Sequence, residues 1–155
     1  MRTLAGITGL RIAAAFVAGL LVAGCQLLVG APVPPASQGD AQWGPLTVVE
    51  GDFDFDAGAG PGRLNIGRRC VTLRGGGAAT TLVWPSARTR WDGASGQIEF
   101  DDRDRGPIQI RDGMTVTLGG GDPDVLPDLV WLVPLSPACS EATFLVTQVV
   151  IEDQP

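Results

Sequence analysis

Short runs of apolar and polar residues, separated by glycine, proline and aspartate, follow one another from Trp43 onward. In Leu46–Asp56, the rings of Phe53 and Phe55 alternate with three aspartates, which is typical of a strand with one buried and one solvated face. Val49 and Gly51 share the parity of Phe53, whereas Leu46 and Val48 have the opposite parity, so we expect a bulge or bend near Gly51. Further strands are predicted at Arg63–Ile66, Cys70–Arg74, Thr80–Trp84, Gln97–Asp101, Ile108–Arg111, Met114–Leu118, Val130–Val133 and Thr143–Ile151.

The final run, Thr143–Ile151, is almost continuously apolar, which predicts a central strand covered on both faces. Two glycine triplets, Gly75–Gly77 and Gly119–Gly121, are expected where the backbone needs a positive φ or a close approach. Strands separated by frequent turn signals are typical of antiparallel sandwiches and small barrels. The sequence therefore predicts one all-β domain over residues 43–155, folded as a small antiparallel barrel similar to an OB-fold or as a sandwich.

The first 25 residues differ from the rest, because Arg2 and Arg11 flank a segment without acids and Ile12–Cys25 is apolar. This is the pattern of a secretory signal. Its end, Val22-Ala23-Gly24-Cys25, resembles the lipobox of bacterial lipoproteins, with an aliphatic residue three positions before the cysteine and small residues between them. The resemblance implies that residues 1–24 are removed as a signal peptide and that the Cys25 thiol carries a diacylglycerol.

Two alternatives remain open for this segment. Ile12–Ala31 has the length of a membrane-spanning helix, and ordinary secretion would cleave near Ala31 or Ala36 and discard Cys25. All three interpretations place the domain outside the cytoplasm, on the extracellular or periplasmic side. In the favoured one, residues 25–42 are a proline-rich tether between the lipidated cysteine and the domain.

Composition narrows the possible chemistry. The chain has 155 residues, and its 11 basic residues are all arginine against 17 acids, with no His, Lys or Tyr and a formal charge of −6. Removing residues 1–24 would leave nine arginines and a charge of −8. The commonest general base and metal ligand are therefore missing, and an acidic chain is a poor partner for nucleic acid.

Three cysteines divide as one plus two. If Cys25 is lipidated, Cys70 and Cys139 are left as a pair in a compartment that permits disulfides, and we predict a bond between them. The alternative is two buried thiols. A zinc site would need more ligands of the Cys and His type than this sequence holds.

Several short motifs of the domain carry a second resemblance: Gly62-x-Leu64, Cys70-Val71-x-Leu73, Leu82-Val83-Trp84-Pro85, the run from Asp112 to Gly121, and Cys139 ahead of the last strand. With these motifs the domain resembles a group of uncharacterised small exported proteins and lipoproteins of bacteria, for which no activity is known. The resemblance implies an all-β fold and no particular function.

Tryptophan and arginine offer one candidate binding surface. Trp84 and Trp91 flank a loop that carries Arg88 and Arg90, so two indoles and two guanidiniums could hold an anionic or glycan ligand. Trp84 and Trp131 lie in apolar runs that predict core packing. Trp91 is therefore the best single candidate.

Acidic clusters offer weaker chemistry. Asp122, Asp124 and Asp128 are the best candidates for calcium, although the calcium-loop pattern with its distal Glu is missing, and we predict no metal site and no cofactor. The run Asp101–Arg105 is self-neutralising and indicates a turn. No carboxylate pair stands out for glycoside hydrolysis, and no His could activate a serine.

The sequence thus predicts a lipid-anchored protein of the cell envelope that acts as a non-catalytic binding or structural module, with an envelope glycan or protein as its partner. Two alternatives are a surface hydrolase that cleaves wall glycans through paired carboxylates and a calcium-dependent adhesion module.

Overall fold

The computed structural model describes residues 38–55 and 57–152, and these residues are nearly all β. Cys25 and the predicted signal peptide lie outside the described residues. A short helix, α2 (Gln38–Trp43), precedes the first strand. The strands are β1 (Thr47–Val49), β2 (Ala57–Ile66), β3 (Val71–Arg74), β4 (Thr80–Pro85), β5 (Thr89–Asp92), β6 (Gln97–Asp102), β7 (Gly106–Ile110), β8 (Thr115–Gly121), β9 (Trp131–Val133) and β10 (Thr143–Ile151).

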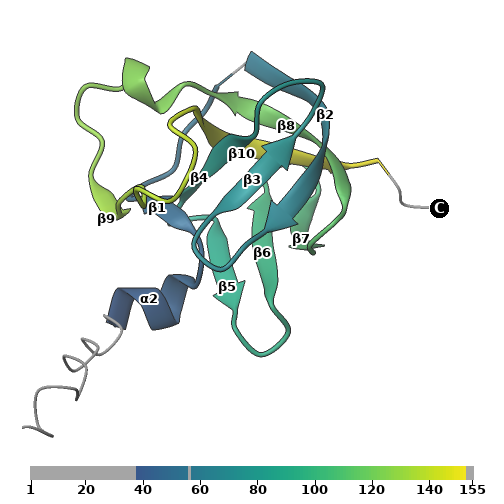
Figure 1. Ribbon diagram of the computed structural model, residues 1–155. Coiled ribbons are helices and arrows are strands. Elements are labelled where there is room, and N and C mark those ends of the chain that lie inside the picture. The colour runs from purple at the N-terminus through teal and green to yellow at the C-terminus, as the bar shows by residue number, and fades with distance from the viewer. Residues whose placement is uncertain (1–37, 56, 153–155) are drawn as a thin grey trace, which may run out of the picture. The chain divides into compact units, whose positions relative to one another are not determined.

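Five strands close into a barrel in the order β10-β8-β2-β3-β4, because β10 also pairs with β4 (Figure 1). The predicted small barrel is therefore confirmed. It is not antiparallel throughout: β10 and β1 both run parallel to β4, along successive halves of the same edge. The long connection from β4 to β10 permits this pairing, which a tight hairpin could not make.

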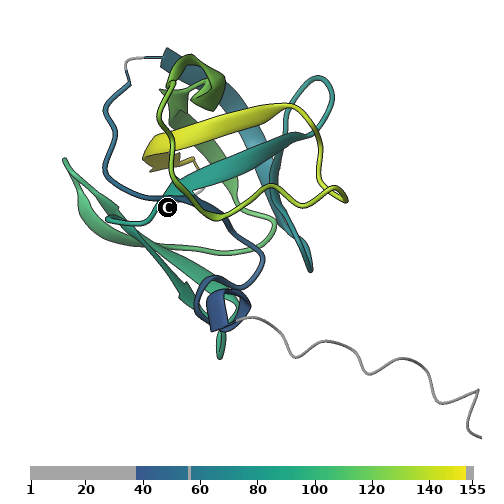
Figure 2. The same ribbon diagram turned by 90° about the vertical axis from the view of Figure 1, so that its left-hand side faces the viewer.

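A second sheet, β5-β6-β7, lies below the barrel in Figures 1 and 2. Its inward residues Ile98, Phe100 and Ile110 belong to the same apolar cluster as Trp84 and Val146 of the barrel. Barrel and sheet therefore share one core, and the ring of Phe100 meets that of Trp84 edge-on at 5.8 Å.

The two tryptophans predicted to be core residues have different positions. Trp84 is fully buried, as predicted. Trp131 is 38% exposed, so the prediction was wrong for this residue. It lies on β9, a short strand at the end of the sheet order, where the residues on both sides of it are also exposed. An edge strand has fewer neighbours to cover its side chains.

For residues 52–55 the predicted alternation of exposed aspartates and less exposed phenylalanines is confirmed, but the predicted strand is wrong there. β1 ends at Val49, and the bend expected at Gly51 is present, with φ +113°. Beyond it, Phe53 and Phe55 are half-buried against the cluster of Val49, Val83 and Leu145 but belong to no strand. The alternation therefore reflects burial on one side of an extended segment.

Three further elements differ from the prediction. Gln38–Trp43 is helical, although residues 38–42 were assigned to the tether, and the indole of Trp43 is buried in the core. Strand β5 was not predicted, and β2 begins earlier than expected, at Ala57, because its first half is built of glycine, alanine and proline. Among the described residues, no helix is long and apolar enough to span a membrane.

The last strand is central, as predicted. β10 pairs with β8 on one edge and β4 on the other, and its middle residues Leu145 to Thr147 are buried. The register with β8 shifts between Val146 and Gln148, which makes Thr147 the extra residue of a β-bulge.

The two glycine triplets differ in whether the structure requires glycine. Gly119, Gly120 and Gly121 lie within β8, and a Cβ on any of them would meet a neighbouring residue too closely. For Gly75–Gly77, the prediction was wrong: no positive φ occurs there, and a Cβ on Gly76 would meet open space.

Replacing Gly120 with alanine should therefore destabilise the barrel. Its φ is +156°, and an added Cβ would overlap the carbonyl oxygen of Leu145 beside the bulge. We expect a loss of at least about 2 kcal/mol in the free energy of unfolding, measured by urea denaturation. Gly76→Ala is the matched control and should change stability by less than about 0.5 kcal/mol. Equal effects of the two substitutions would contradict this account of β8.

Candidate functional site

A groove of about 1030 Å³ opens between the segment that follows helix α2, the β2–β3 turn and the segment after β9. Its walls combine apolar groups with guanidiniums and a carboxylate. The lining residues are Gly44, Pro45, Leu46, Thr47, Ile66, Gly67, Arg68, Arg69, Trp91, Gly96, Asp112, Val133, Pro134 and Ser136. Trp91, the residue predicted to be the best binding candidate, therefore lines this groove.

Two glycines position the indole of Trp91. The ring lies against Gly44, where φ is +54° and a Cβ would collide with the indole, and it also approaches Gly93. On β5, Trp91 pairs with Ile98 of β6 and packs partly on the core. The indole is therefore held in place on one side while it borders the groove.

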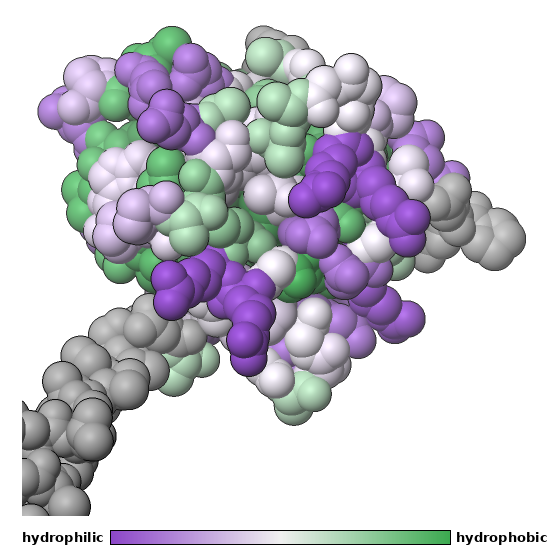
Figure 3. Space-filling model, in the orientation of Figure 1, coloured by the Kyte–Doolittle hydropathy of each residue, from purple (hydrophilic) through white to green (hydrophobic). Residues whose placement is uncertain are grey.

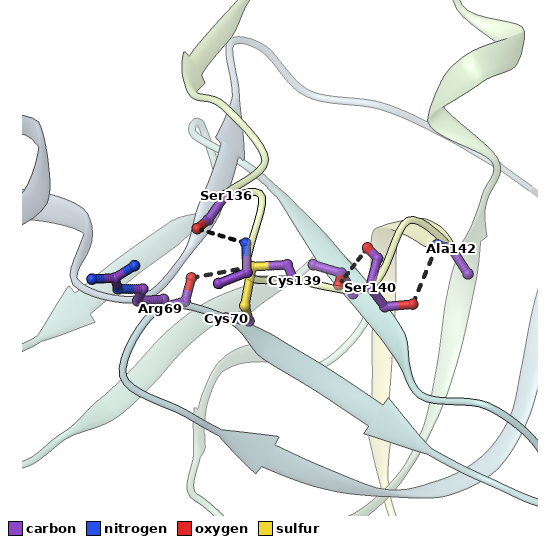
Figure 4. The surroundings of a disulfide bond; sticks show 8 residues. Arg69, Cys70, Ser136, Cys139, Ser140 and Ala142 are labelled. Atoms are coloured by element: carbon purple, nitrogen blue, oxygen red, sulfur yellow. Dashed lines mark hydrogen bonds between the residues drawn. A yellow bond between two sulfur atoms is a disulfide. The ribbon is translucent and has the colours of Figure 1, made fainter.

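The predicted disulfide is present and holds two walls of the groove together. Cys70 and Cys139 are bonded, with their Cα atoms 5.8 Å apart (Figure 4). On one side, Cys70 follows the groove residues Arg68 and Arg69, and the carbonyl oxygen of Arg69 lies 3.5 Å from Sγ of Cys139. On the other side, the N–H of Cys139 donates to the carbonyl of Ser136 at 2.9 Å.

Arg68 and Arg69 were not recognised from the sequence as site residues. Both are exposed and line the groove, so they supply the guanidiniums beside Trp91 that the prediction had assigned to Arg88 and Arg90. They lie more than 20 positions from Trp91, and a strand pattern gives no information on such proximity. The one available signal was their position next to Cys70, since the predicted disulfide brings Cys139 to that turn.

The carboxylate in the groove belongs to Asp112. Its Oδ1 accepts a hydrogen bond from the N–H of Ile66 at 2.7 Å. One of its two carboxylate oxygens therefore joins the β7–β8 turn to β2. Of the described residues that line the groove, only Asp112 is acidic. Hydrolysis of a glycoside needs two facing carboxylates, which this lining does not supply.

The predicted surface of two indoles and two guanidiniums does not form. Trp84 is fully buried, and the Arg88 side chain is 6% exposed, with its guanidinium 4.8 Å from the ring centroid of Phe100. Arg90 is 84% exposed and lies 3.6 Å from a carboxylate oxygen of Glu99. Arg88 turns inward because it binds the buried carbonyl of Thr147 and the partly buried carbonyl of Asp101, whereas Arg90 faces solvent.

The acidic clusters have structural partners. Asp122 caps the 3-10 helix Pro123–Val125 by accepting the N–H of Asp124 at 2.9 Å. Asp52 and Asp54 both pair with Arg103, at 2.9 and 3.0 Å. Within residues 38–55 and 57–152, no three Asp, Glu, Cys or His side chains gather to hold a metal ion, and Asp122, Asp124 and Asp128 are all exposed.

The turn between β5 and β6 depends on the charge of Asp92. Hydrogen bonds from the hydroxyl of Ser95 and from the N–H groups of Ala94 and Ser95 lower the pKa of Asp92 below its usual 3.8. A lowered pKa in the folded state stabilises the fold above the unfolded value of about 4, and this contribution is lost as the pH falls through the folded value.

We therefore expect the melting temperature of the wild type to exceed that of Asp92→Ala at neutral pH, and the gap to narrow below about pH 4. Thermal melting of both proteins across the acidic range measures it, because acid effects common to both cancel in the difference. A gap that stays constant down to pH 2 would contradict the role assigned to this carboxylate.

Comparison with known protein families, curated proteins and solved structures finds no match to this chain. Its function has to be inferred from its own residues.

Proposed function

We propose that the chain is an exported, lipid-anchored protein of the cell envelope whose β-barrel domain binds a ligand without catalysis, in the groove beside Trp91. The observation that carries the proposal is the groove itself, which is lined by a positioned indole, two exposed arginines and several apolar residues. Binding sites combine an apolar lining with a few placed polar groups in this way. Its partner would be an envelope glycan or protein.

Two observations support export. The N-terminal pattern ends in the lipobox-like Val22-Ala23-Gly24-Cys25, and the Cys70–Cys139 bond belongs to a type that persists in oxidising compartments. With Cys25 as the first residue, the mature protein would face the extracellular or periplasmic side from a lipid anchor. The acidic body would be repelled by anionic headgroups, which keeps the groove accessible.

Intact-mass analysis of the membrane-extracted protein tests the anchor. We expect a chain that begins at Cys25, carries a diacylglycerol, and is two hydrogens lighter than its reduced form. A full-length product in the soluble cell interior, with three reactive thiols, would contradict the proposal.

Cosedimentation with an insoluble envelope polysaccharide fraction tests the groove. We expect Trp91→Ala to weaken binding at least about fivefold, because stacking on an aromatic side chain is worth about 1 to 3 kcal/mol for a nucleic-acid base, and a sugar ring on the indole should contribute on the same scale. Trp131→Ala makes the same chemical change outside the groove lining and should leave binding unchanged. Release of reducing sugar ends by the wild type would instead favour a hydrolase, and a calcium-dependent rise in melting temperature would favour the adhesion module.

A further inference from the structure

The arginines of the domain fall into two groups. Within the described residues, four have a carboxylate oxygen within 4.0 Å: Arg88, Arg90, Arg103 and Arg105. The other five have no such partner there: Arg63, Arg68, Arg69, Arg74 and Arg111. Four of these five lie on β2, β3 or the turn between them, and Arg111 immediately follows β7. Among the described residues, the arginines without a carboxylate partner are therefore confined to one hairpin and the adjoining turn.

Two of these arginines face each other across the hairpin. Arg63 of β2 pairs in register with Arg74 of β3, and both are exposed. Like charges directly opposite each other destabilise a strand pair. The guanidinium of Arg63 also approaches Gly113, and a pocket of about 340 Å³ is lined by Arg63, Leu64, Asn65, Arg74, Asp112 and Gly113. An anionic group in this pocket would replace the repulsion with two attractive contacts.

This pocket and the Trp91 groove share a wall. Asp112 lines both, so the two hollows adjoin along the β2–β3 hairpin. Arg63 and Arg74 line one hollow, and Arg68 and Arg69 line the other, so the positive charge lies in two groups with Asp112 bordering both. Figure 3 shows the hairpin face with strongly hydrophilic side chains in separate groups and paler surface between them. Such spacing suits a ligand with repeated anionic groups better than a single compact anion.

We propose that this face binds an acidic polysaccharide that crosses from the Trp91 groove to the Arg63–Arg74 pocket. Guanidinium groups bind carboxylate and phosphate oxygens in two-pronged geometry, and the indole offers a flat apolar surface to a sugar ring. This inference rests on the proposed binding function and names its ligand class. An acidic domain repels polyanions elsewhere on its surface, which confines binding to the hairpin.

Binding of the detergent-extracted protein to polygalacturonate tests the inference, with neutral dextran and inorganic polyphosphate as comparison polymers. We expect polygalacturonate to bind and dextran not to bind. Each of two double variants, Arg63→Gln with Arg74→Gln and Arg68→Gln with Arg69→Gln, should weaken the affinity at least about tenfold. Raising the salt from about 0.05 M to about 0.5 M should weaken it further.

A charge-matched control is Arg90→Gln with Arg103→Gln, which removes the same charge from exposed arginines that already have acidic partners. This control should bind as the wild type does. An equal loss in the control would overturn the site, and so would binding of dextran as tightly as polygalacturonate. The protein could instead bind polyphosphate more tightly than polygalacturonate, with an affinity that Trp91→Ala does not change. That result would overturn the proposal that the ligand is a polysaccharide.

These results separate the two proposals. If the protein binds the envelope fraction through Trp91 but not polygalacturonate, the inferred ligand class is wrong and the binding function stands. If the wild type binds no envelope fraction at all, the binding function fails as well.

Discussion

Replacing Arg88 with alanine should lower the free energy of unfolding by about 4 kcal/mol, the largest effect we expect from a single residue outside the glycines. Nε of Arg88 donates to the carbonyl of Asp101 on β6, and Nη1 donates to the carbonyl of Thr147 on β10, both at 2.7 Å. One side chain therefore links the three-stranded sheet to the barrel. Without it, the buried carbonyl of Thr147 and the partly buried carbonyl of Asp101 lose their donor, and a buried polar group left without a partner costs about 1 to 3 kcal/mol.

The β-bulge explains why a buried arginine is needed. Thr147 is the extra residue of the bulge on β10, and such a residue is left outside the regular ladder. A buried carbonyl requires a donor, and the guanidinium supplies it while its flat face lies against Phe100. Asp102 acts at the same junction, because its buried carboxylate accepts the N–H of Val149 on β10 at 3.2 Å.

Arg90 provides a matched control for this prediction. It lies two residues further along the chain, is 84% exposed, and pairs only with Glu99 among the described residues. Arg90→Ala should therefore cost less than about 1 kcal/mol. Arg88→Lys should recover only part of the loss, since one ammonium cannot reproduce the fork that reaches both carbonyls. Urea denaturation of the variants measures these differences, and equal stability of the two alanine variants would refute the linking role.

Removing the disulfide with Cys70→Ser and Cys139→Ser should cost about 4 kcal/mol, because the bond closes a loop across 69 positions in the unfolded chain. The effect should also reach the groove. The bond joins the turn that carries Arg68 and Arg69 to the segment that carries Ser136, and both line the groove. We therefore expect the double variant to lose affinity for the envelope fraction even at temperatures where it remains folded.

Reduction of the wild type provides an independent check. Dithiothreitol should shift its urea midpoint to that of the double serine variant and leave the variant unchanged. Cys25→Ser should keep the midpoint of the wild type, because Cys25 forms no part of this bond. A midpoint unaffected by reduction would show that the bond contributes little to stability.

The local pattern of apolar and polar residues was sufficient to predict several of the strands. The alternation over Met114–Leu118 and the continuous apolar run of Thr143–Ile151 were recognised as strands, because each residue's neighbours along the chain reveal which faces are buried. The same rule failed for Phe53 and Phe55, which are half-buried without a ladder. It also missed the first half of β2, because the glycine and alanine residues there do not alternate between apolar and polar side chains.

In the candidate site, too, the sequence predicted one residue and the structure revealed the others. Trp91 could be selected as a single residue because large indoles next to polar turns are distinctive. Its partners could not, because Arg68 and Arg69 reach the groove through the β2–β3 turn and the disulfide, and the burial of Arg88 depends on a carbonyl 59 positions away. The residues that flank an arginine in the sequence do not reveal whether its guanidinium faces solvent or binds a buried carbonyl at a β-bulge.

The chain's order of residues thus carried the all-β class, the central last strand and the pairing of two cysteines, since each depends on periodicity or on counting. The parallel closure of β10 on β4, the inward turn of Arg88 and the placement of Arg68 and Arg69 in the groove of Trp91 arose from contacts between distant segments. Those contacts are selected by packing and by the need to satisfy buried polar groups. Both depend on residues that are distant in the sequence, so the local sequence around a residue does not reveal them.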